Sequence, residues 1–390
     1  MSGSPPPARG VFGGSAWRIG HVAGIEIAVD HSWLLIFALI TFSLGGQFSA
    51  AHESWSPPVV WFSAIVTSLL FFASIVLHEL GHSLTAQRLG VGVASITLFV
   101  FGGMAQLRSQ PKRPRDEVLI ALAGPLVSIV LGLGFSAMAG AIGESSDGPL
   151  SAILAWLGRI NVVLAIFNVV PGIPLDGGRV LRGLVWALTG SFQRATKIAA
   201  ASGSLVAYTL IFLGIVSALL GGQVVGGLWL VFIGWFLLSA ARASVGQVVV
   251  EGILSRVRSE SVMEPVGGLC LTGRETVADL IVESVLRHGY RTFYVVDPVG
   301  ALLGIVTLGE LAGVAADDRA HTLARSVMTP IDRLHVLRPE NTGWDALQTM
   351  AEFGVNQLPV VRAGRLIGAV TRERLLALVQ AGSALHPRRD

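Results

Sequence analysis

The sequence predicts a polytopic α-helical membrane protein with about six transmembrane helices and a membrane-dipping β-hairpin, followed by a cytoplasmic α/β domain. Three observations support this fold class. Of 390 residues, 52% are hydrophobic and 14% are charged, whereas soluble domains carry about 25% charged residues. Six apolar segments of about 20 residues, the length that crosses a bilayer, lie between residues 30 and 245. A repeat of ordinary soluble composition follows them.

The membrane domain is expected over residues 31–245, after an N-terminal cytoplasmic segment, 1–30, that has no apolar core typical of a cleavable signal peptide. We predict spans at 32–50, 58–82, 117–142, 151–170, 196–220 and 224–244. Arg159 and Asn161 interrupt the fourth span, and we expect Arg159 to snorkel or to pair within the bundle. Arginine and lysine gather in alternate loops, which predicts that both termini are cytoplasmic.

A short β-rich segment, SITLFVFGGMAQLRS, separates the second and third spans. Its β-branched and aromatic residues predict strands, and Gly102–Gly103 predicts a turn. The segment is too short to cross a bilayer as a helix. We interpret it as a hairpin that dips into the cytoplasmic face of the membrane, with a surface hairpin as the alternative.

The soluble part contains an internal repeat, which predicts one domain built from two similar units. Ser261–Asp297 matches Ser326–Arg362 at an offset of 65 residues. We expect a linker at 246–260, a domain at 261–380 with repeats at 261–315 and 326–380, and a tail at 381–390. Each repeat is predicted to run strand, helix, strand, strand, helix.

The motif HELGH, His78 to His82, closes the second span. Two histidines four residues apart lie on one face of a helix, so both imidazoles can reach one zinc ion, and Glu79 can act as general base. The alternative is a polar patch at a helix end held by hydrogen bonds. The position favours function, because ionisable groups within a membrane helix are costly.

A third zinc ligand is available in NVVPGIPLDGGR, which runs from Asn168 to Arg179. The predicted topology places Asp176 on the same side of the membrane as His78. A loop aspartate on its own is most often a turn or helix N-cap residue. Beside the histidine motif, the ligand interpretation is favoured.

These motifs together resemble the site-2 protease family (peptidase M50B), the zinc intramembrane metalloproteases. HELGH, the NVVPGIPLDGG segment, AGPLVS at 123–128 and the Gly102–Gly103 hairpin carry the resemblance, over residues 17–245. It implies that His78, His82 and Asp176 bind one Zn²⁺ per chain and that Glu79 is the catalytic base. It also implies that Asn168 and the hairpin glycines contact the substrate backbone, although Asn168 could instead make a helix-packing hydrogen bond.

The implied activity is hydrolysis of peptide bonds in or next to transmembrane segments, as in regulated intramembrane proteolysis. The substrate would be a membrane protein such as an anti-sigma factor, in contact with membrane lipid at a bacterial plasma membrane. Nucleic acid is excluded as a partner, because no basic cluster is interleaved with aromatic residues. The single cysteine, Cys270, excludes intrachain disulfides and cysteine-based zinc sites.

The repeats resemble tandem cystathionine-β-synthase (CBS) domains, which often bind adenine nucleotides between the repeats. The sequence departs from the nucleotide pattern after Thr307 and Thr371, where Glu310 and Arg374 replace the aspartate expected to meet the ribose. Nucleotide sensing and a structural or homodimerising role both stay open. An alternative overall function is a transporter or channel gated by these repeats, and a third is an inactive relative that acts as a scaffold.

Overall fold

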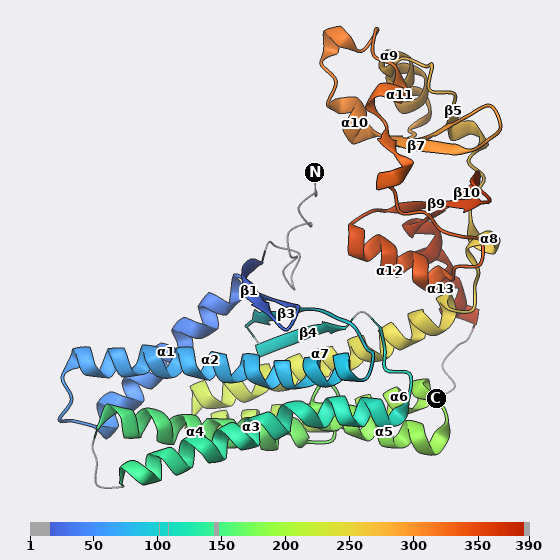
Figure 1. Cartoon of the computed structure of the whole chain (residues 1–390). Coiled ribbons are helices and arrows are strands. Elements are labelled where there is room, and N and C mark those ends of the chain that lie inside the picture. The colour runs from blue at the N-terminus through green and yellow to red at the C-terminus, as the bar shows by residue number, and fades with distance from the viewer. Residues whose placement is uncertain (1–15, 101, 108, 144–147, 386–390) are drawn as a thin grey trace. The chain divides into compact units, whose positions relative to one another are not determined.

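The computed structural model describes residues 16–100, 102–107, 109–143 and 148–385 (Figure 1). The chain divides into two compact units, one ending at Gly246 and the other beginning at Gln247.

Six helices of the described chain are long and apolar enough to cross a membrane, which confirms the predicted fold class. They are α1 (Ser32–Ala51), α2 (Pro57–Arg88), α3 (Pro114–Ile142), α4 (Pro149–Val169), α6 (Phe192–Leu219) and α7 (Val224–Leu254). Proline opens α2, α3 and α4, because the first helical position needs no N–H donor. Large apolar side chains remain exposed on these helices, as lipid-facing surfaces require.

Helix α3 packs against α2, α4 and the short α5 (Asp176–Thr189), and Figure 1 shows it beside α4 and α5. Glycines allow its close contact with α4. A Cβ atom added at Gly132 would lie 2.7 Å from the Val162 side chain, and one at Gly158 would lie 2.4 Å from Ser136 Oγ. Small residues at such contacts let membrane helices approach closely. Helix α3 is therefore in direct contact with α2 and α5, the helices that carry the candidate site residues.

Four strands form one sheet with the order β1-β2-β3-β4. They are β1 (Trp17–Val22), β2 (Ile25–Val29), β3 (Val93–Phe99) and β4 (Gly102–Leu107). The pair β3–β4 is antiparallel and confirms the predicted hairpin, whereas β2 pairs with β3 in parallel. Strands β1 and β2 were not predicted from the sequence. The sheet packs against α2, and Ile25 and Ile96 share a fully buried apolar cluster with Ile120 of α3.

The second unit contains two sheets, one with the order β5-β6-β7-β8 and the other formed by the antiparallel pair β9–β10. The strands are β5 (Cys270–Leu271), β6 (Thr292–Val296), β7 (Leu302–Thr307), β8 (Thr329–Pro330), β9 (Gln357–Arg362) and β10 (Arg365–Thr371). The helices are α8 (Ser259–Val262), α9 (Val277–Asp279), the π-helical η2 (Leu280–Leu286), α10 (Leu308–Ala312), α11 (Ala324–Val327), α12 (Gly343–Phe353) and α13 (Arg372–Leu385). Three short 3₁₀ turns are η1 (Gly267–Leu269), η3 (Ala316–Asp318) and η4 (Ile331–Arg333).

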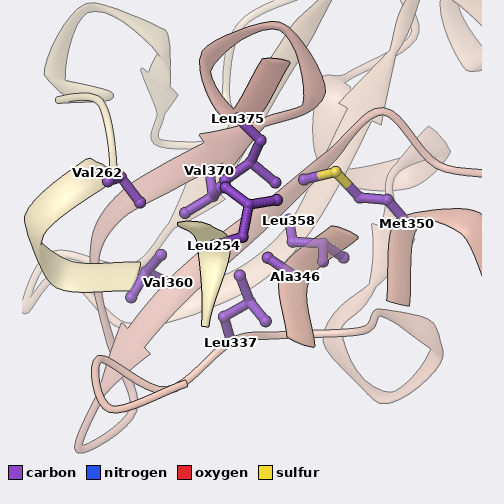
Figure 2. Packing of buried hydrophobic residues seen from close by; sticks show 9 residues of the cluster. All are labelled: Leu254, Val262, Leu337, Ala346, Met350, Leu358, Val360, Val370 and Leu375. Atoms are coloured by element: carbon purple, nitrogen blue, oxygen red, sulfur yellow. The ribbon is translucent and has the colours of Figure 1, made fainter. Parts of the chain in front are cut away.

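Each repeat has its own apolar core. Phe293 and Val295 occupy the first, and Leu358 and Val360, 65 residues later, occupy the second. Figure 2 shows the second core, where Leu254 lies among residues of the second repeat. The segment before the first repeat therefore packs into the core of the second, which ties both repeats into one domain.

Candidate metal centre

Two histidines of α2 and one aspartate of α5 meet in a buried cluster. His78 Nε2 lies 3.2 Å from Asp176 Oδ2, His82 Nε2 lies 3.1 Å from the same oxygen, and the two Nε2 atoms are 3.2 Å apart. All three residues are at most 9% exposed. The structure thus brings together the residues that the sequence proposed as ligands, and among the described residues they form a group able to hold a metal ion.

The triangle of ligand atoms suits a small tetrahedral ion. Zinc binds histidine nitrogen and carboxylate oxygen at about 2.0–2.2 Å, so tetrahedral ligands lie roughly 3.4 Å from one another. The observed separations of 3.1–3.2 Å are close to that value. Two nitrogens and one oxygen are also a donor set typical of catalytic zinc, which keeps a fourth position for water or substrate.

Hydrogen bonds to α3 orient both imidazole rings. His82 Nδ1 lies 2.6 Å from the carbonyl oxygen of Ile120, and a carbonyl can only accept, so Nδ1 carries the proton and Nε2 keeps its lone pair. His78 Nδ1 lies 2.9 Å from the Ser128 hydroxyl. Metal-binding histidines are held in this way by a partner on the other ring nitrogen.

Gly124 of α3 leaves the space that the cluster occupies. A Cβ atom at this position would lie 2.1 Å from His82 Nε2 and 2.7 Å from His78 Nε2. The space in front of Gly124 thus holds the two ligating nitrogens. Sequence reasoning missed Gly124, Ser128 and the Ile120 carbonyl as site residues, although AGPLVS contains the first two.

Asp176 is the first residue of α5, with Leu175 as the N-cap. Its carboxylate points to the histidines, and the capping alternative is therefore wrong. The tight turn before it depends on Gly177, where a Cβ would lie 2.1 Å from the Val169 carbonyl oxygen. Burial alone would raise the pKa of Asp176, but the neighbouring imidazoles of His78 and His82 outweigh burial and hold the pKa below the usual carboxyl range.

A buried ion cluster fixes α5 against α3. Glu117 of α3 is fully buried, and its Oε1 atom lies 3.2 Å from Arg179 Nε and also accepts a hydrogen bond from Arg182. Both arginines belong to the helix that begins with Asp176. Helix α3 therefore positions all three candidate ligands, the histidines directly and the aspartate through this cluster. The sequence did not indicate this pairing.

Glu79 lies beside the edge strand β4. A Cβ atom at Gly103 would lie 2.4 Å from Glu79 Cγ, so the strand backbone passes directly along the candidate base. Gly102 begins the strand. Asn168 lies half-buried in the last turn of α4, and its side chain makes no hydrogen bond with the described residues. The catalytic role of Glu79 and the substrate contacts of the other three stay predictions.

The second unit contains a cavity of about 1090 Å³ between its repeats. Three arginines line it, Arg291, Arg333 and Arg372, together with Glu310. Glu310 accepts hydrogen bonds from Thr307 and Thr329, which outweigh burial and lower the pKa of its carboxyl.

Two family models match the chain. The model of peptidase family M50 matches residues 66–144 and 135–212, and the CBS domain model matches residues 324–381. The putative zinc metalloprotease Rip3 of Mycobacterium tuberculosis is 33% identical, over 95% of this chain and 94% of the relative. The putative zinc metalloprotease sll0528 of Synechocystis is 32% identical, over 96% of this chain and 98% of that relative. A solved structure, the site-2 protease from Methanocaldococcus jannaschii, covers 59% of this chain and 95% of that chain at 30% identity and a TM-score of 0.42.

Proposed function

The chain belongs to peptidase family M50, and on that premise we propose how this zinc metalloprotease works. His78, His82 and Asp176 hold a single zinc ion, and Glu79 is the base that activates water. The observation that supports this assignment is the triangle of two imidazole nitrogens and one carboxylate oxygen, 3.1–3.2 Å apart, with Glu79 next to His78 in the chain.

Bound zinc supplies Lewis acidity toward the scissile carbonyl and lowers the pKa of water to about 7. The Glu79 carboxylate takes the proton of the attacking water, whose oxygen bonds to the carbonyl carbon. It then delivers that proton to the amide nitrogen as the C–N bond breaks. Gly103 keeps side-chain atoms away from the Glu79 carboxyl during both transfers.

The substrate segment binds in extended form along β4. A transmembrane helix has its backbone groups hydrogen-bonded internally, so it must unwind before its carbonyls become accessible. Strand β4 has an unpaired edge within the described sheet, which can accept an added strand. We assign Gly102 and Gly103 to this strand contact and Asn168 to a hydrogen bond with the substrate backbone.

The repeats serve as a regulatory module. The cavity between them is lined by three arginines and by two glutamates, Glu310 and Glu373, and the excess of positive charge suits an adenine nucleotide phosphate. Calorimetric titration of the full chain with AMP and ATP tests this role. Heat of binding that disappears in Arg333→Ala supports it, and a flat response in the wild type favours the structural or homodimerising role.

We place the protein in the plasma membrane of a bacterium, as a multi-pass protein in contact with lipid and with both termini cytoplasmic. The loop charges support this orientation.

The substrate is a membrane protein such as an anti-sigma factor. The experiment that identifies the substrate is a search for the membrane protein that accumulates uncut in cells carrying Glu79→Gln. The alternative function, a transporter or channel gated by the repeats, is less well supported because it assigns no role to Glu79.

Cleavage of that substrate by the purified chain in vesicles tests the mechanism. Glu79→Gln should retain zinc and lose cleavage by about 10²- to 10⁴-fold, the contribution typical of a general base. Glu26→Gln is the matched control, since Glu26 pairs with Arg18 on the sheet, away from the cluster. Cleavage by Glu79→Gln at the rate of the control would refute the assigned base.

A further inference from the structure

Arg159 is a charged residue on the outer face of a membrane-spanning helix. It is the eleventh of the 21 residues of α4, and its side chain is exposed. In the described chain it makes no ion pair or hydrogen bond. The prediction that Arg159 pairs within the bundle is therefore wrong as far as the described residues are concerned.

Arg159 lies at the centre of an apolar stripe. Successive helical residues are rotated by about 100°, which places Ala155, Val163 and Ile166 within roughly 40° of it. All three are exposed. The opposite side of α4, including Leu157 and Asn161, is buried against the bundle. The guanidinium thus projects from the face that meets lipid.

Arg159 lies far from both ends of its span. Each end of α4 is about 15 Å away along the axis. Long side chains near helix ends snorkel to the interface, whereas a charge at the midpoint of a span is costly because it has the longest distance to cover. An intramembrane charge at this depth usually pairs with another group, and such residues mark functional contacts.

A second copy of this chain offers no suitable counter-charge. Among the described residues of the six spans, the carboxylates are Glu79, Asp116, Glu117 and Glu251. Glu79 belongs to the metal centre, Asp116 and Glu117 lie in the first turn of α3, and Glu251 lies in the last turn of α7. None is near the midpoint of its helix, where it could meet Arg159 at equal depth.

We propose that the outer face of α4 around Arg159 binds a transmembrane helix of another protein that carries an aspartate or glutamate near its midpoint. The carboxylate pairs with the guanidinium in the membrane interior. Ala155, one turn away, lets the partner backbone approach closely. This surface lies outside the metal centre, and its function does not depend on the proposed catalytic roles.

Synthetic transmembrane helices test the proposal with the full-length protein in phosphatidylcholine vesicles. One peptide carries a glutamate at its midpoint, and the control peptide carries glutamine there. Energy transfer should show preferential association of the glutamate peptide. Arg159→Leu should weaken it by about 30-fold or more, the lower end of the effect of removing one partner of an interfacial charge pair. Arg159→Glu should restore association with a peptide that carries arginine at its midpoint.

Equal association of both peptides with the wild type, or undiminished association with Arg159→Leu, would overturn the proposal. The zinc content of Arg159→Leu verifies that the variant is folded. Depth is measured separately with a label on Arg159→Cys in a Cys270→Ser background, which leaves one cysteine. Quenching by lipids labelled deep in the acyl chains is expected. Quenching at headgroup depth would place position 159 within reach of lipid phosphate, and would also overturn the proposal.

Discussion

Substitution of Gly124 by alanine should weaken zinc binding strongly, although alanine is the better helix former. In an ordinary helix the change would favour folding by about 1 kcal/mol. In α3 the new Cβ atom would lie 2.1 Å from His82 Nε2, 2.5 Å from His82 Cε1 and 2.7 Å from His78 Nε2. The substitution should therefore reduce the zinc affinity of the metal centre and not the stability of the helix.

The magnitude follows from these distances. Non-bonded atoms do not approach a Cβ within 3.0 Å, so the His82 ring must retreat by about an ångström. A metal–ligand distance tolerates only about 0.2 Å. Loss of ring orientation alone lowers metal affinity by 10- to 100-fold, so the expected loss is at least about 100-fold, or about 2.7 kcal/mol.

Competition with a chromogenic chelator measures this affinity, and thermal unfolding of the metal-free protein verifies folding. Gly134→Ala is the matched control, because Gly134 lies on the same helix with nothing within 4 Å of the new methyl group. The control should bind zinc like the wild type. If Gly124→Ala binds zinc as tightly as Gly134→Ala, the placement of the metal against α3 is wrong.

Three further substitutions probe the surroundings of the site and the repeats. Glu117→Gln should lower the free energy of unfolding by about 3–5 kcal/mol, because two arginines lose a buried counter-charge. The control Glu260→Gln, which removes a charge from a surface pair, should lower it by only about 0–1 kcal/mol. Equal losses in the two variants would contradict the role of the buried cluster. Gly103→Ala should keep zinc and slow cleavage, because its Cβ would contact Glu79 Cγ; an unchanged kcat would argue against it. Threonine hydroxyls outweigh burial and lower the pKa of Glu310, so its stabilisation is present at neutral pH and lost as pH falls through that lowered pKa. The destabilisation of Glu310→Gln, measured by thermal unfolding, should therefore shrink from pH 7 to pH 3, and a constant effect would refute the linkage.

The membrane helices and the hairpin could be predicted because their signals are local. Runs of about 20 apolar residues define spans, and Gly102–Gly103 between β-branched residues defines a turn. The spacing of His78 and His82 likewise encodes one helical face. Each of these features depends on residues close together in the chain.

Features that depend on distant pairing could not be predicted. Strand β2 pairs with β3 in parallel, with Ile27 opposite Ile96, and no local pattern specifies a partner about 70 residues away. The partners of Glu117 belong to α5, and the role of Gly124 depends on the histidines of α2. The exposure of Arg159 depends equally on which face of α4 packs against the bundle. Packing between elements decides all of these.

Zinc K-edge X-ray absorption on the purified full chain tests the central claim most directly. We predict one zinc per chain, with two imidazole nitrogens at about 2.0–2.1 Å and carboxylate oxygen at about 2.0–2.2 Å. Asp176→Asn should change this first coordination shell or empty the site. A sulfur ligand from Cys270, or an unchanged spectrum in Asp176→Asn, would contradict the assignment of His78, His82 and Asp176 as the metal centre.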